Sequence, residues 1–157
     1  MMASQCTGYI PIHYFPTLIP GGAKLSRIRN KDLEQQPFVD GEFYIVIIQD
    51  VMERVFDLAS EYKEIYRTLR DGGVYIHTFP MRKWLDCAIT ARVILGEDGG
   101  IPHIADPEYH GNPINEKGAL VTVDYSYEVH QWIASQYRSM FGSIGSMTHI
   151  TDHWGIN

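Results

Sequence analysis

The residues best suited to acid–base chemistry are adjacent in the sequence, where Glu108, Tyr109 and His110 follow one another. A carboxylate or an imidazole can accept a proton from a hydroxyl group, so Glu108 or His110 is a candidate general base. A structural alternative stays open. Tyr109 and His110 could instead pack this segment onto a sheet, with Gly111 and Pro113 shaping its turn.

Two more carboxylates, Asp50 and Glu53, lie at the end of the apolar run 43–50 and just after it. Ligands of open α/β proteins bind at the carboxyl ends of parallel strands. If this run is such a strand, both carboxylates lie where a ligand would bind. The alternative is that they cap a helix or are solvated charges in a loop.

The elements around these carboxylates form a strand–helix–strand pattern. Residues 43–50 are a nearly continuous aromatic and β-branched run, which predicts a strand buried on both faces. Asp57 opens a helix over 58–69, and Gly72–Gly73 end it. A second strand of the same type follows at 74–80. A right-handed crossover then makes the two strands parallel.

The remaining elements are less regular. Residues 91–104 predict a hairpin around a glycine turn, and residues 106–118 predict an irregular loop. Asp124 is expected to cap a helix over 125–137. Short strands are expected elsewhere, at 8–15, 24–30 and 146–151.

Length and charge limit the class of protein. The chain has 157 residues, which predicts one domain over 1–157. A net charge of −6 gives no electrostatic basis for binding nucleic acid. We find no basic and apolar leader and no apolar stretch long enough to cross a bilayer. We therefore expect no nucleic-acid partner and no membrane association. Because the two cysteines form no disulfide framework, we expect a reducing, cytoplasmic location.

The residues that could bind a metal do not form a convincing set. Cys6 and Cys87 are far apart and form no paired motif. His149, Asp152 and His153 are close in sequence, but a metal site usually needs a third or fourth ligand in suitable geometry. We expect no metal.

Two segments carry a resemblance to a known family. The segment 38–80 and the loop before it resemble the central signature of class I S-adenosylmethionine (SAM)-dependent methyltransferases, most closely the type 11 subgroup. The matching positions are Asp32, Leu33, Pro37, Phe38, Phe43, Asp50, Glu53, Leu69, Gly72 and Gly73. The later EYHGNP sequence, residues 108–113, resembles a narrower subset with a PEYHGNP insertion.

The resemblance implies an α/β fold with an incomplete, mostly parallel Rossmann-like sheet. It also implies a hairpin and loop insertion after the fifth family strand, with residues 82–123 as a lid over the acceptor. His110, Glu108 and Tyr109 would then be the catalytic residues. The implied cofactor is SAM, held by the residues Asp32, Leu33, Asp50, Glu53 and His13.

This chain also departs from the family pattern. The family fold begins with a strand and a glycine-rich loop that approaches the cofactor, and we find neither in this sequence. His13, Tyr44 and Arg54 stand where the family has a glutamate, another acid and a histidine.

Two functions therefore stay open. One is methyl transfer to a small molecule or sugar.

The other function is that of a truncated, non-catalytic remnant that serves as a binding or oligomerisation module. Without its first strand the sheet would leave backbone groups unpaired, which is costly when they are buried. We therefore expect a homodimer that completes the sheet.

Overall fold

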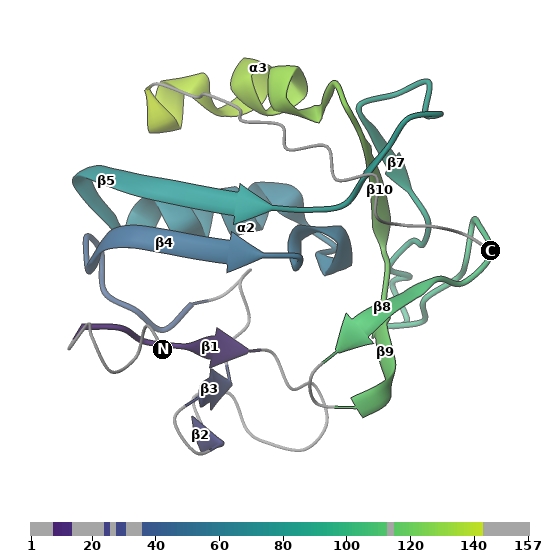
Figure 1. Ribbon diagram of the computed structural model, residues 1–157, viewed down its shortest axis with the longest axis horizontal. Coiled ribbons are helices and arrows are strands. Elements are labelled where there is room, and N and C mark those ends of the chain that lie inside the picture. Colours follow the sequence, from purple (N-terminus) through teal and green to yellow (C-terminus); the bar gives the residue numbers. More distant parts are fainter. Residues whose placement is uncertain (1–7, 14–23, 26–27, 31–35, 113–114, 143–157) are drawn as a thin grey trace.

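A computed structural model describes residues 8–13, 24–25, 28–30, 36–112 and 115–142 (Figure 1). The described residues form an α/β structure of small sheets and two α-helices. Its elements, in chain order, are β1 (Ile12–His13), β2 (Lys24–Leu25), β3 (Ile28–Asn30), β4 (Phe43–Gln49), the 3₁₀ turn η1 (Met52–Arg54), α2 (Leu58–Thr68), β5 (Leu69–Thr78), β6 (Met81–Arg82), β7 (Ile89–Ala91), β8 (Tyr109–Asn112), β9 (Asn115–Leu120), β10 (Val123–Ser126) and α3 (Val129–Phe141).

The predicted strand–helix–strand unit is confirmed. β4 and β5 pair in parallel, with Ile45 opposite Val74 and Gln49 opposite Thr78. The helix that joins them, α2, lies behind the two strands in Figure 1. Asp57 is its N-cap, as expected, because its carboxylate accepts hydrogen bonds from the backbone of Ala59 and Ser60.

The helix bounds are predicted to within one residue, but the prediction that Gly72 and Gly73 end the helix is wrong. α2 ends at Thr68, and Leu69 already has an extended backbone. The two glycines lie inside β5, where the pairing with β4 is irregular between Phe43 and Ile45. Gly72 has φ of +75°, a conformation that glycine adopts at little cost. The glycines therefore shape a bulge that leads into the strand.

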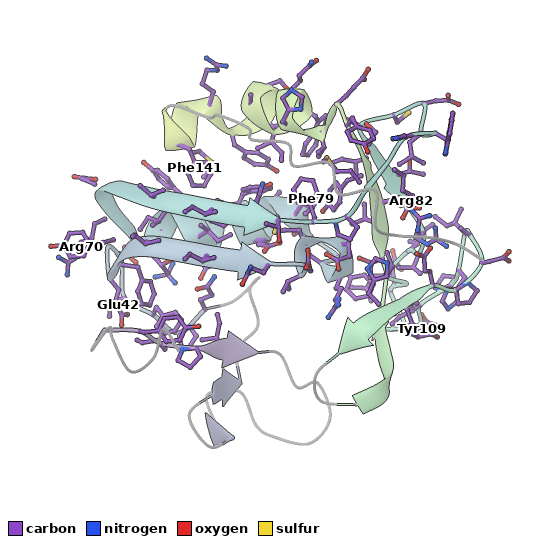
Figure 2. The ribbon with its side chains drawn as sticks, in the orientation of Figure 1. Glu42, Arg70, Phe79, Arg82, Tyr109 and Phe141 are labelled. Carbon is purple, nitrogen blue, oxygen red and sulfur yellow. The ribbon has the colours of Figure 1, made fainter. Side chains whose placement is uncertain are left out.

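The core lies on one side of the β4–β5 pair. Its buried apolar residues come from β4, η1, α2, β10 and α3, and they are Ile48, Met52, Tyr62, Ile65, Val123, Tyr125, Val129 and Ile133. Figure 2 shows Phe141 pointing from α3 toward β5, where its ring lies 6.1 Å from that of Tyr75. α2 and α3 thus both pack against the β4–β5 pair.

The prediction that β4 and β5 are buried on both faces is wrong. The outward-facing side chains of the pair keep between 49% and 57% of their surface exposed, and they are Ile45, Ile47, Val74 and Ile76. No element among the described residues covers this face. The apolar run arises because one face meets the core, while the other remains an exposed apolar surface, called the β4–β5 face below.

The residues around Asp124 form a strand and not a helix start. β10 pairs in parallel with β6 and antiparallel with β7. All residues from 121 to 126 are buried, which suits their β-branched and aromatic content. The helix starts later, with Glu128 as the N-cap residue of α3. Tertiary pairing therefore outweighed the local capping signal of Asp124.

The insertion is more ordered than expected. Residues predicted as an irregular loop include β8 and β9, which pair antiparallel. The predicted hairpin over 91–104 is present as an antiparallel bridge between Val93 and His103, with a turn that closes by a hydrogen bond from Gly96 to Gly100.

The sheet is not the single, mostly parallel one that we expected. The described strands form four separate small sheets, with as many antiparallel as parallel pairings. β1 pairs in parallel with β3, and this small sheet lies on the β4 side of the molecule (Figure 1). The strand expected at 146–151 lies outside the described residues.

Candidate functional site

The structure brings together three of the carboxyl and imidazole groups that the sequence singled out. Glu53 belongs to the turn η1 that follows β4, and its side chain is buried, since the residue is 1% exposed. Its Oε1 lies 3.3 Å from Nδ1 of His110, while Nε2 of His110 lies 3.2 Å from Oε1 of Glu108. His110 therefore bridges two carboxylates that are far apart in sequence.

Glu108 belongs to a second group of charges that the sequence did not predict. Arg82 and Arg92 each contact both Glu108 and Asp124, so the four side chains form a closed ring. Arg82 Nε lies 2.8 Å from Asp124 Oδ1, and Arg92 Nη1 lies 2.7 Å from Asp124 Oδ2. Figure 2 shows Arg82 beside β10. This ring fixes the start of β8 to β6 and β10.

The ring also sets the charge of Glu108. Its partial burial by itself would raise the pKa, because burial disfavours the charged form. Hydrogen bonds from Arg82 and His110 and the charges of Arg82 and Arg92 outweigh burial and lower the pKa of Glu108. Glu108 is therefore ionised at neutral pH and is a weak proton acceptor.

The turn that carries Glu53 is held by hydrogen bonds from the segment that enters β10. Thr122 donates from its backbone to the carbonyl of Glu53 at 2.8 Å, and from its hydroxyl to the carbonyl of Val55 at 2.8 Å. Tyr125 donates its hydroxyl to the carbonyl of Met52 at 2.9 Å. These buried bonds hold Glu53 where it meets His110.

Asp50 lies at the carboxyl end of β4, apart from the His110 cluster. It is exposed, and its φ of 51° is in the left-handed region, which few residues other than glycine adopt. Thr78, at the end of β5, donates from its hydroxyl to Asp50 Oδ1 at 3.1 Å. The carboxyl ends of both parallel strands thus fix an exposed carboxylate.

The other predicted residues do not join this cluster. Tyr109 is exposed, and strand alternation places it on the face of β8 opposite His110. Asp32 and Leu33 lie outside the described residues, and so does the side chain of His13.

The sequence analysis missed Arg82, Arg92 and Asp124. Asp124 was predicted to be a helix cap, and its partners are 42 and 32 residues away along the chain. The sequence offers one indication of this charge cluster: two arginines, Arg82 and Arg92, precede the Glu108–His110 triplet.

The described residues contain no group of three or more His, Cys, Asp or Glu side chains that could hold a metal ion. The three residues considered above for a metal, His149, Asp152 and His153, lie outside that part of the chain. Within it, no helix is both long and apolar enough to span a membrane.

Comparison with known proteins gives one match. Residues 14–77 match the model of a family described as a methyltransferase domain. The match ends near the end of β5, so it includes Asp50 and Glu53 but not Glu108 or His110. No curated protein and no solved structure matches the chain. The match supports a relationship to SAM-dependent methyltransferases and suggests methyl transfer in general.

Proposed function

We propose that this protein transfers a methyl group from SAM to a small-molecule or sugar acceptor. The observation that carries the proposal is the family match over residues 14–77, which includes the whole β4–α2 unit and most of β5. Members of that family typically use SAM. The carboxyl ends of β4 and β5 are where an open α/β sheet binds its ligand.

Of the residues proposed for the cofactor, Asp50 fits best. Its carboxylate is exposed at the carboxyl end of β4 and is oriented by Thr78. Glu53 fits a different role, because its buried carboxylate faces His110. We propose that Glu53 orients the imidazole of His110. A direct bond from Glu53 to a cofactor would require Glu53 to give up its contact with His110. Asp32, Leu33 and His13 complete the proposed cofactor set.

On the acceptor side we propose His110 as the general base. SAM supplies an electrophilic methyl group when it is bound. With its Nδ1 hydrogen donated to Glu53, neutral His110 has a lone pair on Nε2. To take the proton from an acceptor hydroxyl, Nε2 must exchange its contact with Glu108 Oε1, at 3.2 Å, for that hydroxyl. Glu108 stays ionised beside Arg82, and Tyr109 lines the exposed side of the lid. Most of the rate enhancement then comes from aligning acceptor and methyl group.

Calorimetric titration with SAM or S-adenosylhomocysteine tests this proposal. We expect a dissociation constant in the micromolar range, weakened about tenfold in the Asp50→Ala variant by loss of one charged hydrogen bond. The exposed Asp71 gives a matched control, since Asp71→Ala should leave binding unchanged. No heat at millimolar ligand would contradict the proposal.

The second candidate is the non-catalytic remnant, a binding or oligomerisation module. The observation in its favour is the exposed β4–β5 face, because apolar surface of this kind often marks an interaction site. The homodimer expected from the sequence would pair the edges of the sheet, so a dimer that covers this face is a separate proposal. We further propose a single domain over 1–157, a cytoplasmic location and no nucleic-acid or membrane partner, on the grounds of length, charge and hydropathy.

A further inference from the structure

Asp50 has a backbone conformation that glycine would adopt more easily. Among the described residues it is the only one besides glycines with a φ in the left-handed region, at 51°. Aspartate tolerates this region better than most residues, but a Cβ atom still makes it less favourable than it is for glycine. A turn that needed only this backbone shape would be served better by glycine. The side chain of Asp50 therefore calls for a reason of its own.

Two hydrogen bonds tie Asp50 to Thr78. The backbone N–H of Asp50 donates to the carbonyl of Thr78 at 3.0 Å, which continues the parallel pairing beyond Gln49. The hydroxyl of Thr78 donates to Oδ1 of Asp50 at 3.1 Å. Within the described part of the chain this is the one hydrogen bond that the carboxylate accepts, so Oδ2 is open to a ligand.

The hydroxyl bond of Thr78 lies outside the core. Side chains alternate along β5, where Tyr75 packs against the core while Ile76 and Thr78 are exposed. Thr78 therefore lies on the β4–β5 face, at the carboxyl end of both strands. An exposed hydrogen bond contributes little to stability, because water competes for both of its groups. The bond is thus better placed to orient the carboxylate of Asp50 than to hold the fold together.

We propose that Thr78 is a positioning residue for the cofactor site, and that the left-handed Asp50 is kept for its carboxylate. This inference rests on the proposed function, in which Asp50 contacts SAM. Thr78 holds Oδ1 and limits the carboxylate to one orientation, so Oδ2 is a fixed acceptor for a donor of the ligand, such as an ammonium or a hydroxyl group. A side chain that is already ordered raises affinity, because it loses less freedom on binding.

Two substitutions separate the side chain of Asp50 from its backbone. Asp50→Ala removes the carboxylate and keeps the left-handed strain, whereas Asp50→Gly removes the carboxylate and relieves the strain. We expect SAM binding, measured by calorimetry, to weaken about tenfold in both variants. The folding equilibrium constant, from urea denaturation, should be about fivefold higher in Asp50→Gly than in Asp50→Ala. If Asp50→Gly binds SAM as the unmodified protein does, the backbone and not the carboxylate is what matters, and the proposal is wrong.

Substitutions of Thr78 test whether it acts through Asp50. Thr78→Val removes the hydroxyl but keeps the carbonyl that accepts from Asp50, so the dissociation constant for SAM should rise about threefold. Thr78→Ser should restore the affinity, and Thr90→Val, at an exposed position of β7, should leave it unchanged. Added to Asp50→Ala, Thr78→Val should have no further effect. An equal loss with and without the carboxylate would show a merely structural role.

NMR couplings between the α and β protons of Asp50 test its orientation without a ligand. We expect one χ1 rotamer in the unmodified protein and in Thr78→Ser, and averaging among rotamers in Thr78→Val. Averaged couplings in the unmodified protein would overturn the positioning role, whether or not SAM binds. If SAM does not bind while the single rotamer is present, the proposed function fails and the cofactor role of Thr78 fails with it, but the orientation of Asp50 by Thr78 stands.

Discussion

At the scale of single residues, the site depends on buried polar groups that find partners from distant parts of the chain. Glu53 is held by Thr122 and faces His110, and both partners lie more than fifty residues further along the sequence. A buried group without such partners would be destabilising. Single substitutions at these positions should therefore have effects out of proportion to the atoms removed.

Thr122→Val should lower the free energy of unfolding by about 1–2 kcal/mol, because the buried carbonyl of Val55 loses its hydroxyl donor. Urea denaturation followed by circular dichroism measures the change. Thr90 is exposed in β7, so Thr90→Val is a matched control and should change stability much less. Equal effects of the two substitutions would show that the buried hydroxyl of Thr122 contributes nothing to the free energy of unfolding.

His77 should make stability depend on pH. Burial lowers the pKa of His77 to about 4, so the folded protein keeps this ring neutral while the unfolded chain can charge it. The unfolded state then binds more protons, and stability falls as the pH drops from about 6.5 toward 4. In His77→Phe this decline should be smaller, as denaturation at several pH values would show. His103→Gln serves as the exposed control, and a decline unchanged in His77→Phe would contradict the assignment.

At the scale of elements, local signals fixed the start of α2 but not that of α3. Asp57 accepts two backbone hydrogen bonds at the first turn of α2, which satisfies donors that have no partner within the helix. Asp124 has the same residue type, but its side chain binds Arg82 and Arg92 instead. A capping residue therefore marks a helix only where no tertiary partner competes for its oxygen atoms.

Asp57→Ala should destabilise the protein by about 1 kcal/mol through loss of the cap. Hydrogen bonds from the side chain and backbone of Ser60 lower the pKa of Asp57 despite a small opposing effect of burial. This contribution is present above the ordinary carboxyl pKa and is lost as the pH falls through the lowered one. Thermal unfolding at neutral and acidic pH measures it. Asp86→Ala, at an exposed loop position, should show no such loss, and a cap effect that persists at low pH would be inconsistent with this account.

At the scale of the whole molecule, the two faces of the β4–β5 pair differ in how much of their surface is buried. The core side of β4 and β5 is packed by α2 and α3, whereas the β4–β5 face is exposed along both strands. Within the insertion over 82–123, the ring joins Arg82, Arg92 and Glu108 to Asp124 of β10. Assembly, if it occurs, should use the exposed face.

If the β4–β5 face forms a dimer, Ile47→Lys should weaken self-association by at least tenfold, because a charge placed in an apolar interface has no partner there. Sedimentation velocity at several concentrations measures the change. Ile104 is similarly exposed but lies in the insertion, so Ile104→Lys should have no effect. A protein that stays monomeric at high micromolar concentration, or equal effects of both variants, would rule out this interface.

The sequence by itself determined the β4–α2–β5 unit, because the apolar run, the Asp57 cap and the parallel crossover depend on local patterns. It also singled out Glu53, Glu108 and His110 as residues able to do chemistry. Only the tertiary structure decided that these three meet, and that one face of β4 and β5 stays exposed. The reason is physical: both outcomes depend on which distant segments pack together, and hydrophobic patterns record burial but not the identity of the partner.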